Sequence, residues 1–368
     1  PDTLGANVVK DLLKRNASID PADVDDVIMG CAFPEASQGL NIARQIALLG
    51  GLPDSVPGMT INRFCSSGLQ TIAMAAERIM VGGADVIIAG GVESMSMVPM
   101  GGLSFQPNPE IVDGRPEIYI SMGLTAENVA TKYKISRDDQ DEFAYQSHQK
   151  AIAAWENDRF KSQISKVDVV EQVVASNGDV RKREFQFEKD EGPRADTSVE
   201  VLSKLRAVFK QGGSVTAGNS SQMNDAAAAV MVVSGDYVKE HNLEPIARYV
   251  AFQVAGVAPE FMGIGPVEAI PKVLNKAGLE KKSVDLIELN EAFAAQALAV
   301  IRELELDKSI TNVNGGAIAM GHPLGCTGAK LTTQILHELS ARKKKYGMVT
   351  MCIGGGMGAA GIFENLIR

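Results

Sequence analysis

The sequence predicts an α/β protein built from two similar halves, with a different segment inserted into the first half. Three observations support this prediction: residues 8–30 and 269–290 share one pattern of helix, turn and strand, strands alternate with helices after both stretches, and the alternation stops between residues 104 and about 205. Strands that alternate with helices predict mostly parallel sheets covered on both faces.

The internal repeat begins with VVKDLLKRNASIDPADVDDVIMG at residues 8–30 and AIPKVLNKAGLEKKSVDLIELN at residues 269–290. With a gap of a single residue, these segments align so that Val24 matches Val284. Both copies continue in the order strand, Asn, glycine-bearing loop, helix, strand and Gly-Gly. The second copy has a longer loop, GGAIAMGHPLGC, and extra residues in a strand-to-helix loop are where function is usually added.

Residues 104 to about 205 read as an inserted, partly helical domain. This region contains QPNPEIVDGRPE and charged stretches such as SRDDQDEF, and eight Lys and Arg residues gather between positions 181 and 210. Such a charge run usually covers a solvated face, although some of these residues could contact a phosphate-bearing cofactor. Residues 215–242 return to helix-and-strand patterning and are expected to close the first copy.

Composition indicates a globular protein that acts on small molecules. The 368 residues are 45% hydrophobic, which supplies core for two or three domains, and the net charge of -9 argues against surfaces for nucleic acid or anionic membranes. The longest apolar run, AAAAVMVV, is far shorter than the roughly 18 residues of a membrane span. No secretory signal is visible at the start of the chain, so we expect a cytoplasmic location.

The four cysteines lie far apart, without a C-x-x-C pair or a histidine at metal-ligand spacing, so we expect no metal site. Cys65 follows the strand-like GMTINRF and precedes an apolar helix. At a helix N-terminus the unpaired N–H groups and the helix dipole would favour its thiolate and lower its pKa. Taken alone, Cys65 fits packing as well as nucleophilic catalysis, because buried free cysteines usually act as small hydrophobic residues.

Two later motifs place reactive side chains beside glycines. NVNGGAIAMGHPLGCTG holds His322 in a loop too rich in glycine to be a helix interior, and MVTMCIGGGMG places Cys352 at the end of a buried strand. Open α/β sheets bind ligands at the carboxyl ends of their strands, so Cys65, His322 and Cys352 are expected to converge there.

LIELNEAFAAQALAV places Asn290 and Glu291 at a strand-to-helix junction. These residues could simply cap the helix, with Asn as the cap and Glu in the first turn. The chain contains neither a Rossmann G-x-G-x-x-G after an N-terminal strand nor a G-x-x-x-x-G-K-[ST] loop, and GGGMG is only a weak match. The serine-hydrolase elbow G-x-S-x-G is also absent from the sequence.

Taken in order, NRFCSSGLQ, GGVESMS, NEAFAAQ, GGAIAMGHPLGCTGA and CIGGGMG closely resemble the thiolases. The resemblance covers essentially the whole chain. It implies the thiolase fold, a duplicated five-layer α/β/α/β/α core with an inserted loop domain that holds coenzyme A. The halves would be residues 1–103 with 206–245 and residues 246–368, and the loop domain residues 104–205.

The family normally has a further strand before PDTLGA, and we expect an unpaired edge in the first sheet without it. The N-terminus thus looks incomplete, which leaves an organellar location open. The resemblance also implies a homodimer or homotetramer and leaves open a hydratase-dehydrogenase subunit as a further partner. Coenzyme A would act as a co-substrate, with no permanently bound cofactor.

The resemblance assigns a role to each motif. Cys65 would be the acylated nucleophile, His322 its activating base and Cys352 the acid/base. Asn290, through a water, and His322 would form one oxyanion hole, and the N–H groups of Cys65 and Gly354 the other. Four further positions would contact coenzyme A: Met122, Arg194, Ala251 and Phe293.

These roles suit thiolytic cleavage of a 3-ketoacyl-CoA to acetyl-CoA and a shortened acyl-CoA, in two half-reactions through an acyl-Cys65 intermediate. GHPLGCTGA resembles the degradative, β-oxidation type of thiolase, and YISMG lacks the His that acetoacetyl-CoA thiolases tend to have before Met-Gly. The alternatives are a biosynthetic thiolase that condenses two acetyl-CoA, and a thiolase-like scaffold that binds acyl-CoA without turnover. A ketoacyl synthase fits less well, because CIGGGMG has no place in its pattern.

Overall fold

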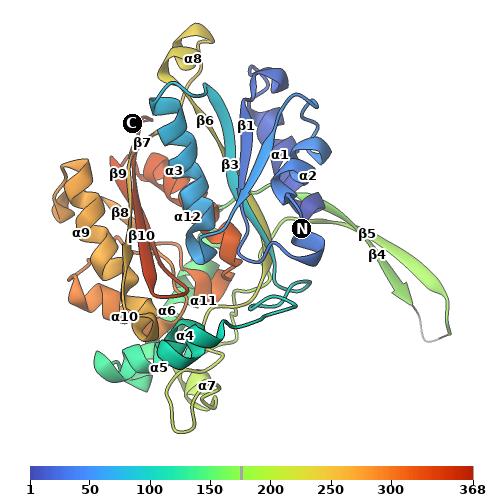
Figure 1. Cartoon of the computed structure of the whole chain (residues 1–368). Coiled ribbons are helices and arrows are strands. Elements are labelled where there is room, and N and C mark those ends of the chain that lie inside the picture. The colour runs from blue at the N-terminus through green and yellow to red at the C-terminus, as the bar shows by residue number, and fades with distance from the viewer. Residues whose placement is uncertain (175–176, 368) are drawn as a thin grey trace.

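A computed structural model describes residues 1–174 and 177–367. Two four-stranded sheets lie on either side of a central pair of helices, and further helices cover the outer face of each sheet (Figure 1). This arrangement confirms the duplicated five-layer core that the sequence predicts.

The first sheet has the strand order β2-β1-β3-β6. β1 is parallel to β2 and β3, whereas β6 is antiparallel to β3. The bounds are β1 (Asp26–Gly30), β2 (Gly58–Ile61), β3 (Val86–Ser94) and β6 (Asp225–Val233). The prediction of a mostly parallel sheet is therefore correct for the first half.

The second sheet has the order β7-β10-β9-β8, and only β8 and β9 are parallel. Its strands are β7 (Ala247–Gly256), β8 (Leu286–Leu289), β9 (Tyr346–Ile353) and β10 (Met357–Asn365). The prediction of a mostly parallel sheet is wrong here because the glycines after β9 make a hairpin turn. Gly355 and Gly356 adopt φ values of 81° and 84°. A turn this short can join only antiparallel strands.

The middle layer consists of α3 (Ser67–Met80) and α12 (Leu324–Arg342), whose buried side chains share one core with both sheets. The outer face of the first sheet is covered by α1 (Asp2–Arg15) and α2 (Ile42–Leu49). The outer face of the second sheet is covered by α9 (Gly265–Ala277) and α10 (Ala294–Glu303). Cys65 lies just before α3, His322 lies just before α12, and Cys352 lies near the end of β9.

Two glycines let the central helices touch backbone to backbone. A Cβ added to Gly68 would lie 2.6 Å from the backbone nitrogen of Ala329, and one added to Gly328 would lie 2.3 Å from that of Leu69. Gly68 and Gly328 are 260 positions apart, as are Val24 and Val284. The close crossing therefore pairs equivalent positions of the repeat.

The inserted segment is helical with one protruding hairpin. Its helices are α4 (Pro109–Gly114), α5 (Met122–Lys132), α6 (Arg137–Glu156) and α7 (Val199–Ser203). The hairpin of β4 (Val167–Val174) and β5 (Val180–Phe187), which the sequence pattern did not predict, stands away from the body in Figure 1. Arg181, Lys182 and Arg183 are exposed on β5, as expected for a solvated face.

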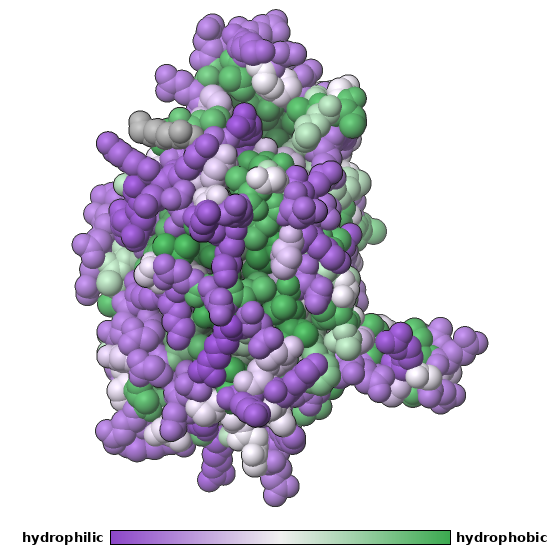
Figure 2. Space-filling view, turned by 90° about the vertical axis from the view of Figure 1, so that its left-hand side faces the viewer, coloured by the Kyte–Doolittle hydropathy of each residue, from purple (hydrophilic) through white to green (hydrophobic). Residues whose placement is uncertain are grey.

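Two short helices complete the fold, α8 (Gly235–Glu240) and α11 (Ala317–Met320). The face of the molecule that carries α9 and the C-terminus is largely hydrophilic, with apolar side chains visible in a central band (Figure 2). Among the described residues, no helix is both long and apolar enough to cross a membrane.

Candidate active site

Cys65 lies in a single 3₁₀ turn, Phe64–Ser66, between β2 and the start of α3. Phe64 has a φ of 43°, a left-handed conformation that is uncommon outside glycine. Side chains on both sides hold this turn: the N–H of Phe64 donates to Asn62 (2.8 Å), and the hydroxyl of Ser67 donates to the carbonyl of Phe64 (2.7 Å). Because neighbouring side chains hold Phe64 in this uncommon conformation, the thiol of the next residue, Cys65, has a fixed position.

Burial, and to a smaller extent the charge of Glu93, raise the pKa of Cys65 to about 12. Backbone N–H groups of Gly354 and of Cys65 itself act in the opposite direction by hydrogen bonding to the sulfur. The sequence-based expectation of a lowered pKa is therefore wrong, because desolvation of the thiolate outweighs the helix terminus. A base must take the proton if this thiol is to react near neutral pH.

Cys352 lies near the end of β9 and is fully buried. Burial raises its pKa well above the ordinary value, and the proximity of Cys65 contributes in the same direction. Cys352 packs in one cluster with Phe293 and Met122, and the sulfur of Met122 lies 3.7 Å from where a Cβ on Gly354 would sit. The structure thus brings the two cysteines, Gly354, Phe293 and Met122 together.

His322 lies in the loop between α11 and α12, as the sequence predicts. Its Nδ1 is 2.7 Å from the hydroxyl of Thr327, and its backbone N–H donates to the carbonyl of Gln222 (3.0 Å). Burial, and then the charge of Lys330, lower its pKa to about 3. The imidazole is neutral near pH 7 and can accept a proton. Leu324, two residues further on, packs in a cluster with Cys65.

Asn290 follows β8 and does not cap α10, whose N-cap is Phe293. Its Nδ2 lies 3.3 Å from Nε2 of His322. Its Oδ1 is buried and has no hydrogen-bond partner in the described part of the chain. Buried polar atoms are rarely left unpaired, so the pair of Asn290 and His322 has the character of a binding site for a polar atom.

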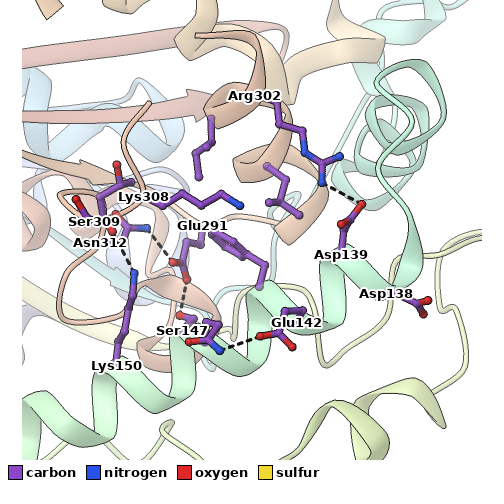
Figure 3. Close-up of a pocket in the computed structure, with 15 residues that line it drawn as sticks. Asp138, Asp139, Glu142, Ser147, Lys150, Glu291, Arg302, Lys308, Ser309 and Asn312 are labelled. Atoms are coloured by element: carbon purple, nitrogen blue, oxygen red, sulfur yellow. Dashed lines mark hydrogen bonds and ion pairs between the residues drawn. The ribbon is translucent and has the colours of Figure 1, made fainter. Parts of the chain in front are cut away.

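Glu291, which follows Asn290, forms hydrogen bonds that connect separate segments of the fold. Its carboxylate accepts hydrogen bonds from Ser147 Oγ (2.6 Å), Asn312 Nδ2 (2.8 Å) and the N–H of Ile318 (3.3 Å). Figure 3 shows Glu291 facing a cavity of about 540 Å³, across which Lys308 extends. Glu291 therefore ties α6 and the loop before α11 to the segment that carries Asn290.

Glu93, the acidic residue of GGVESMS, links the two halves. Its carboxylate, 1% exposed, accepts from the N–H of Ala32, the N–H of Gly325 and Nε2 of Gln38, each at 2.8 Å. Gly325 lies three residues after His322, so this carboxylate positions the start of α12 against the first half.

The other residues expected to contact coenzyme A lie apart from this group. Arg194 is exposed, and its N–H donates to Nδ1 of His148 (3.1 Å). Ala251, on β7, is 4% exposed and packs in the core between the second sheet and α9. The assignment of Ala251 to coenzyme A stays a prediction, which the position of its short side chain in the core does not support.

Sequence reasoning missed the supporting side chains of the site. Glu93 belongs to the motif GGVESMS and Thr327 to GGAIAMGHPLGCTGA, but the motifs by themselves indicate no role for either residue. Thr327 follows His322 by five residues, and a helix begins between them. A hydroxyl in the first turn of that helix can reach back to the histidine, and this pattern could have identified Thr327 from the sequence. The contacts of Glu93 join segments far apart in sequence, so spacing carries no sign of them.

Acidification is expected to destabilise the fold through His322. In the unfolded chain its imidazole titrates near its ordinary pKa of 6.5, whereas in the folded chain the pKa is about 3. The folded pKa is the lower one, so the stabilisation is complete above pH 6.5 and is lost as the pH falls toward 3. Between pH 8 and pH 5 the unfolding free energy should fall by about 2 kcal/mol more in the wild type than in His322→Gln. Urea denaturation at each pH measures this difference, and equal losses in both proteins would contradict it.

Comparison with known proteins gives matches over both halves. Residues 1–236 match the family model described as thiolase, N-terminal domain, and residues 243–365 match thiolase, C-terminal domain. The chain is 54% identical over 364 residues to a protein of Bacillus subtilis (strain 168) named 3-ketoacyl-CoA thiolase, covering 99% of this chain and 93% of the relative.

Other relatives carry a second name. A Pseudomonas aeruginosa protein named acetyl-CoA acetyltransferase is 46% identical over 97% of this chain and 91% of its own length. The crystal structure of the Bacillus anthracis acetyl-CoA acetyltransferase has a TM-score of 0.89 and 42% identity, covering 100% of this chain and 93% of the other. Both names describe acyltransferases.

Proposed function

Because the chain belongs to the thiolase family and is an acyltransferase, we propose that it cleaves 3-ketoacyl-CoA with coenzyme A, giving acetyl-CoA and a shortened acyl-CoA. The observation that supports this proposal is the packing of the end of β9 against the turn that holds Cys65, where a Cβ on Gly354 would lie 3.6 Å from the ring of Phe64. The same end of β9 carries Cys352.

In the first half-reaction Cys65 attacks the 3-keto carbon of the substrate. The Cys65 proton passes to the neutral imidazole of His322, and the new carbon–sulfur bond forms as the carbon–carbon bond to the acetyl unit breaks. The electron pair of that bond remains on the departing acetyl-CoA enolate, which takes the thiol proton of Cys352. The acyl group is then held on Cys65 as a thioester.

In the second half-reaction the Cys352 thiolate takes the proton of the coenzyme A thiol. The resulting thiolate attacks the acyl carbon on Cys65, and the Cys65 sulfur leaves and recovers its proton from His322. Both cysteines and the histidine return to their starting states. The raised pKa of Cys65 and Cys352 suits groups that hold a proton until a substrate is in place.

Two pairs of donors would stabilise the charge that develops on oxygen. We assign the N–H groups of Cys65 and Gly354 to the oxygen on the attacked carbon, and His322 with Asn290, through a water, to the thioester oxygen of the enolate. A donor of this kind is typically worth about 3 to 4 kcal/mol in the transition state. Loss of one donor should therefore be milder than loss of Cys65.

Coenzyme A would be held by the inserted loop domain, residues 104–205, between halves formed by residues 1–103 with 206–245 and 246–368. Met122 and Phe293 lie beside Cys352 and suit the inner end of the cofactor, whereas the exposed Arg194 suits a phosphate. Among the described residues, no group of His, Cys, Asp and Glu is arranged to hold a metal ion. The mechanism requires only coenzyme A as co-substrate. We propose that the active form is a homo-oligomer.

The degradative reaction is preferred over condensation of two acetyl-CoA because of GHPLGCTGA and because YISMG lacks a histidine. Relatives with both names, 3-ketoacyl-CoA thiolase and acetyl-CoA acetyltransferase, keep condensation as the second candidate.

Chain-length kinetics test this choice. We expect kcat/KM for thiolysis of a 3-ketoacyl-CoA of about ten carbons to exceed that for acetoacetyl-CoA by about tenfold or more, since a pocket gains about 1 to 3 kcal/mol per well-placed methylene. Both substrates are measured with saturating coenzyme A. A preference for acetoacetyl-CoA would reverse the assignment to biosynthesis, and absence of turnover with either would favour a binding scaffold.

A further inference from the structure

The hydroxyl of Thr327 makes two contacts in the first turn of α12. Oγ1 lies 2.7 Å from Nδ1 of His322 and 3.1 Å from the carbonyl oxygen of Pro323. Thr327 is 1% exposed and His322 is 4% exposed, so water does not compete freely for either contact. This hydroxyl takes no direct part in the two proposed half-reactions.

The two contacts together favour one position for the proton of the imidazole. A threonine hydroxyl carries one proton, and a carbonyl oxygen can only accept. With its proton on the carbonyl of Pro323, Oγ1 must accept at its other contact, so Nδ1 of His322 carries a hydrogen. In a neutral imidazole Nε2 then holds a lone pair.

The amide of Asn290 lies against the same ring but does not distinguish the two tautomers. Its Nδ2 is 3.3 Å from Nε2 and 3.5 Å from Nδ1 of His322, so it is not directed at one nitrogen alone. The assignment of the tautomer therefore rests on the two contacts of the Thr327 hydroxyl.

We infer that Thr327 is a positioning residue that holds His322 in the Nδ1–H tautomer, so that proton exchange with Cys65 takes place at Nε2. This inference rests on the proposed function of His322 as the base for Cys65. Nε2 first accepts the thiol proton and then, as N–H, can donate to the thioester oxygen. Nδ1 keeps its hydrogen throughout, because Oγ1 remains its acceptor.

The internal repeat places a second hydroxyl at the equivalent position. Ser67, 260 positions before Thr327, lies in the first turn of α3 and donates to the carbonyl of Phe64 (2.7 Å). It also accepts from the N–H of Arg63 (2.9 Å). In each half a hydroxyl at the start of the central helix thus holds the segment that presents a reactive side chain, the thiol in one and the imidazole in the other.

Loss of the Thr327 hydroxyl should remove the contact that keeps the hydrogen of His322 on Nδ1. Nδ1–H would be buried without an acceptor, and the tautomer with hydrogen on Nε2 would then compete. That tautomer cannot accept the thiol proton, so the expected defect is in turnover and not in substrate affinity.

The test compares Thr327→Val, which keeps the shape, with Thr327→Ser, which keeps the hydroxyl. Thr332→Val is the matched control, because Thr332 is fully buried on the same helix and its hydroxyl donates to the carbonyl four residues earlier (2.8 Å) without touching His322. We expect Thr327→Val to lower kcat about 10- to 100-fold with KM changed less than about threefold. Thr327→Ser and Thr332→Val should stay within about threefold of the wild-type kcat.

Nitrogen-15 NMR of histidine-labelled protein at pH 8 reads the tautomer directly. The wild type should show His322 with hydrogen on Nδ1, and Thr327→Val should show hydrogen on Nε2 or a mixture. Hydrogen on Nε2 in the wild type would overturn the inference, even if Thr327→Val did not fold. An unchanged kcat and spectrum in Thr327→Val would also overturn it. Retained turnover in Cys65→Ser would instead overturn the proposed function, whatever the tautomer.

Discussion

Replacement of Cys65 by serine is expected to lower thiolysis by about 10⁴-fold or more while leaving the fold intact. A serine hydroxyl is a weaker acid and a poorer nucleophile than a thiol, so the neutral imidazole of His322 activates it far less effectively. The oxygen also forms an ester, which coenzyme A cleaves less readily than a thioester. The residual rate should reflect binding and the oxyanion donors alone.

Steady-state thiolysis with a 3-ketoacyl-CoA and coenzyme A measures this loss, and mass spectrometry after incubation with acetyl-CoA tests its cause. The wild type should gain one acetyl group on Cys65, and Cys65→Ser should gain none. Cys326→Ala is the control: Cys326 is fully buried in α12 and should affect stability but not turnover.

Limiting iodoacetamide supplies a second readout. Burial raises the pKa of all four cysteines, but Cys65 is 7% exposed and the others are 0% exposed, so alkylation should fall on Cys65. Near-normal thiolysis in Cys65→Ser, or alkylation chiefly at Cys31 or Cys326, would contradict the assignment of the nucleophile.

Replacement of Gly328 by alanine is expected to destabilise the protein by about 3 kcal/mol, enough to reduce the yield of folded enzyme. The new Cβ would lie 2.3 Å from the backbone nitrogen of Leu69. Neither side of this contact is a flexible side chain, so α3 and α12 must move apart. The two sheets share one core through these helices, and separation would loosen packing in both halves.

Urea denaturation measures the change, with Gly235→Ala as the matched control. Gly235 is also helical, in the first turn of α8, but a Cβ there meets no atom within 4 Å. Its replacement should be neutral or slightly stabilising, because alanine restricts the unfolded chain. Similar stabilities for the Gly328 and Gly235 variants would show that the helix crossing can relax.

The sequence predicted the alternating α/β halves, and the resemblance to the thiolases supplied the five layers. The two cysteines lie close to one another, whereas the convergence of His322 with them stays a prediction. Cys65, His322 and Cys352 could be found because each follows a strand or starts a helix, and strand ends meet at one edge of a sheet. The repeat also indicated which strands correspond. These features depend on the order of strands, helices and motifs along the chain, which can be read directly from the sequence.

Other features depend on burial and distant contacts, which a sequence does not display. The pKa of Cys65 was predicted in the wrong direction because the helix terminus is visible in sequence, whereas desolvation is not. Ala251 was assigned to a cofactor from the resemblance alone, and nothing local in the sequence shows that its side chain is buried. The second sheet was predicted as mostly parallel because strands alternate with helices in both copies, and the glycines before β10 were not recognised as a hairpin turn.

The crossing of α3 and α12 has a consequence for how the catalytic unit is assembled. The core between the sheets draws Leu69 and Ile72 from one half and Leu331 and Ile335 from the other, so this core belongs to neither half alone. A fragment that ended near residue 245 would present the inner face of α3 to solvent and would lack His322 and Cys352. The duplicated halves therefore behave as complementary fragments of a single cooperative unit: acyl transfer can begin only after both have docked.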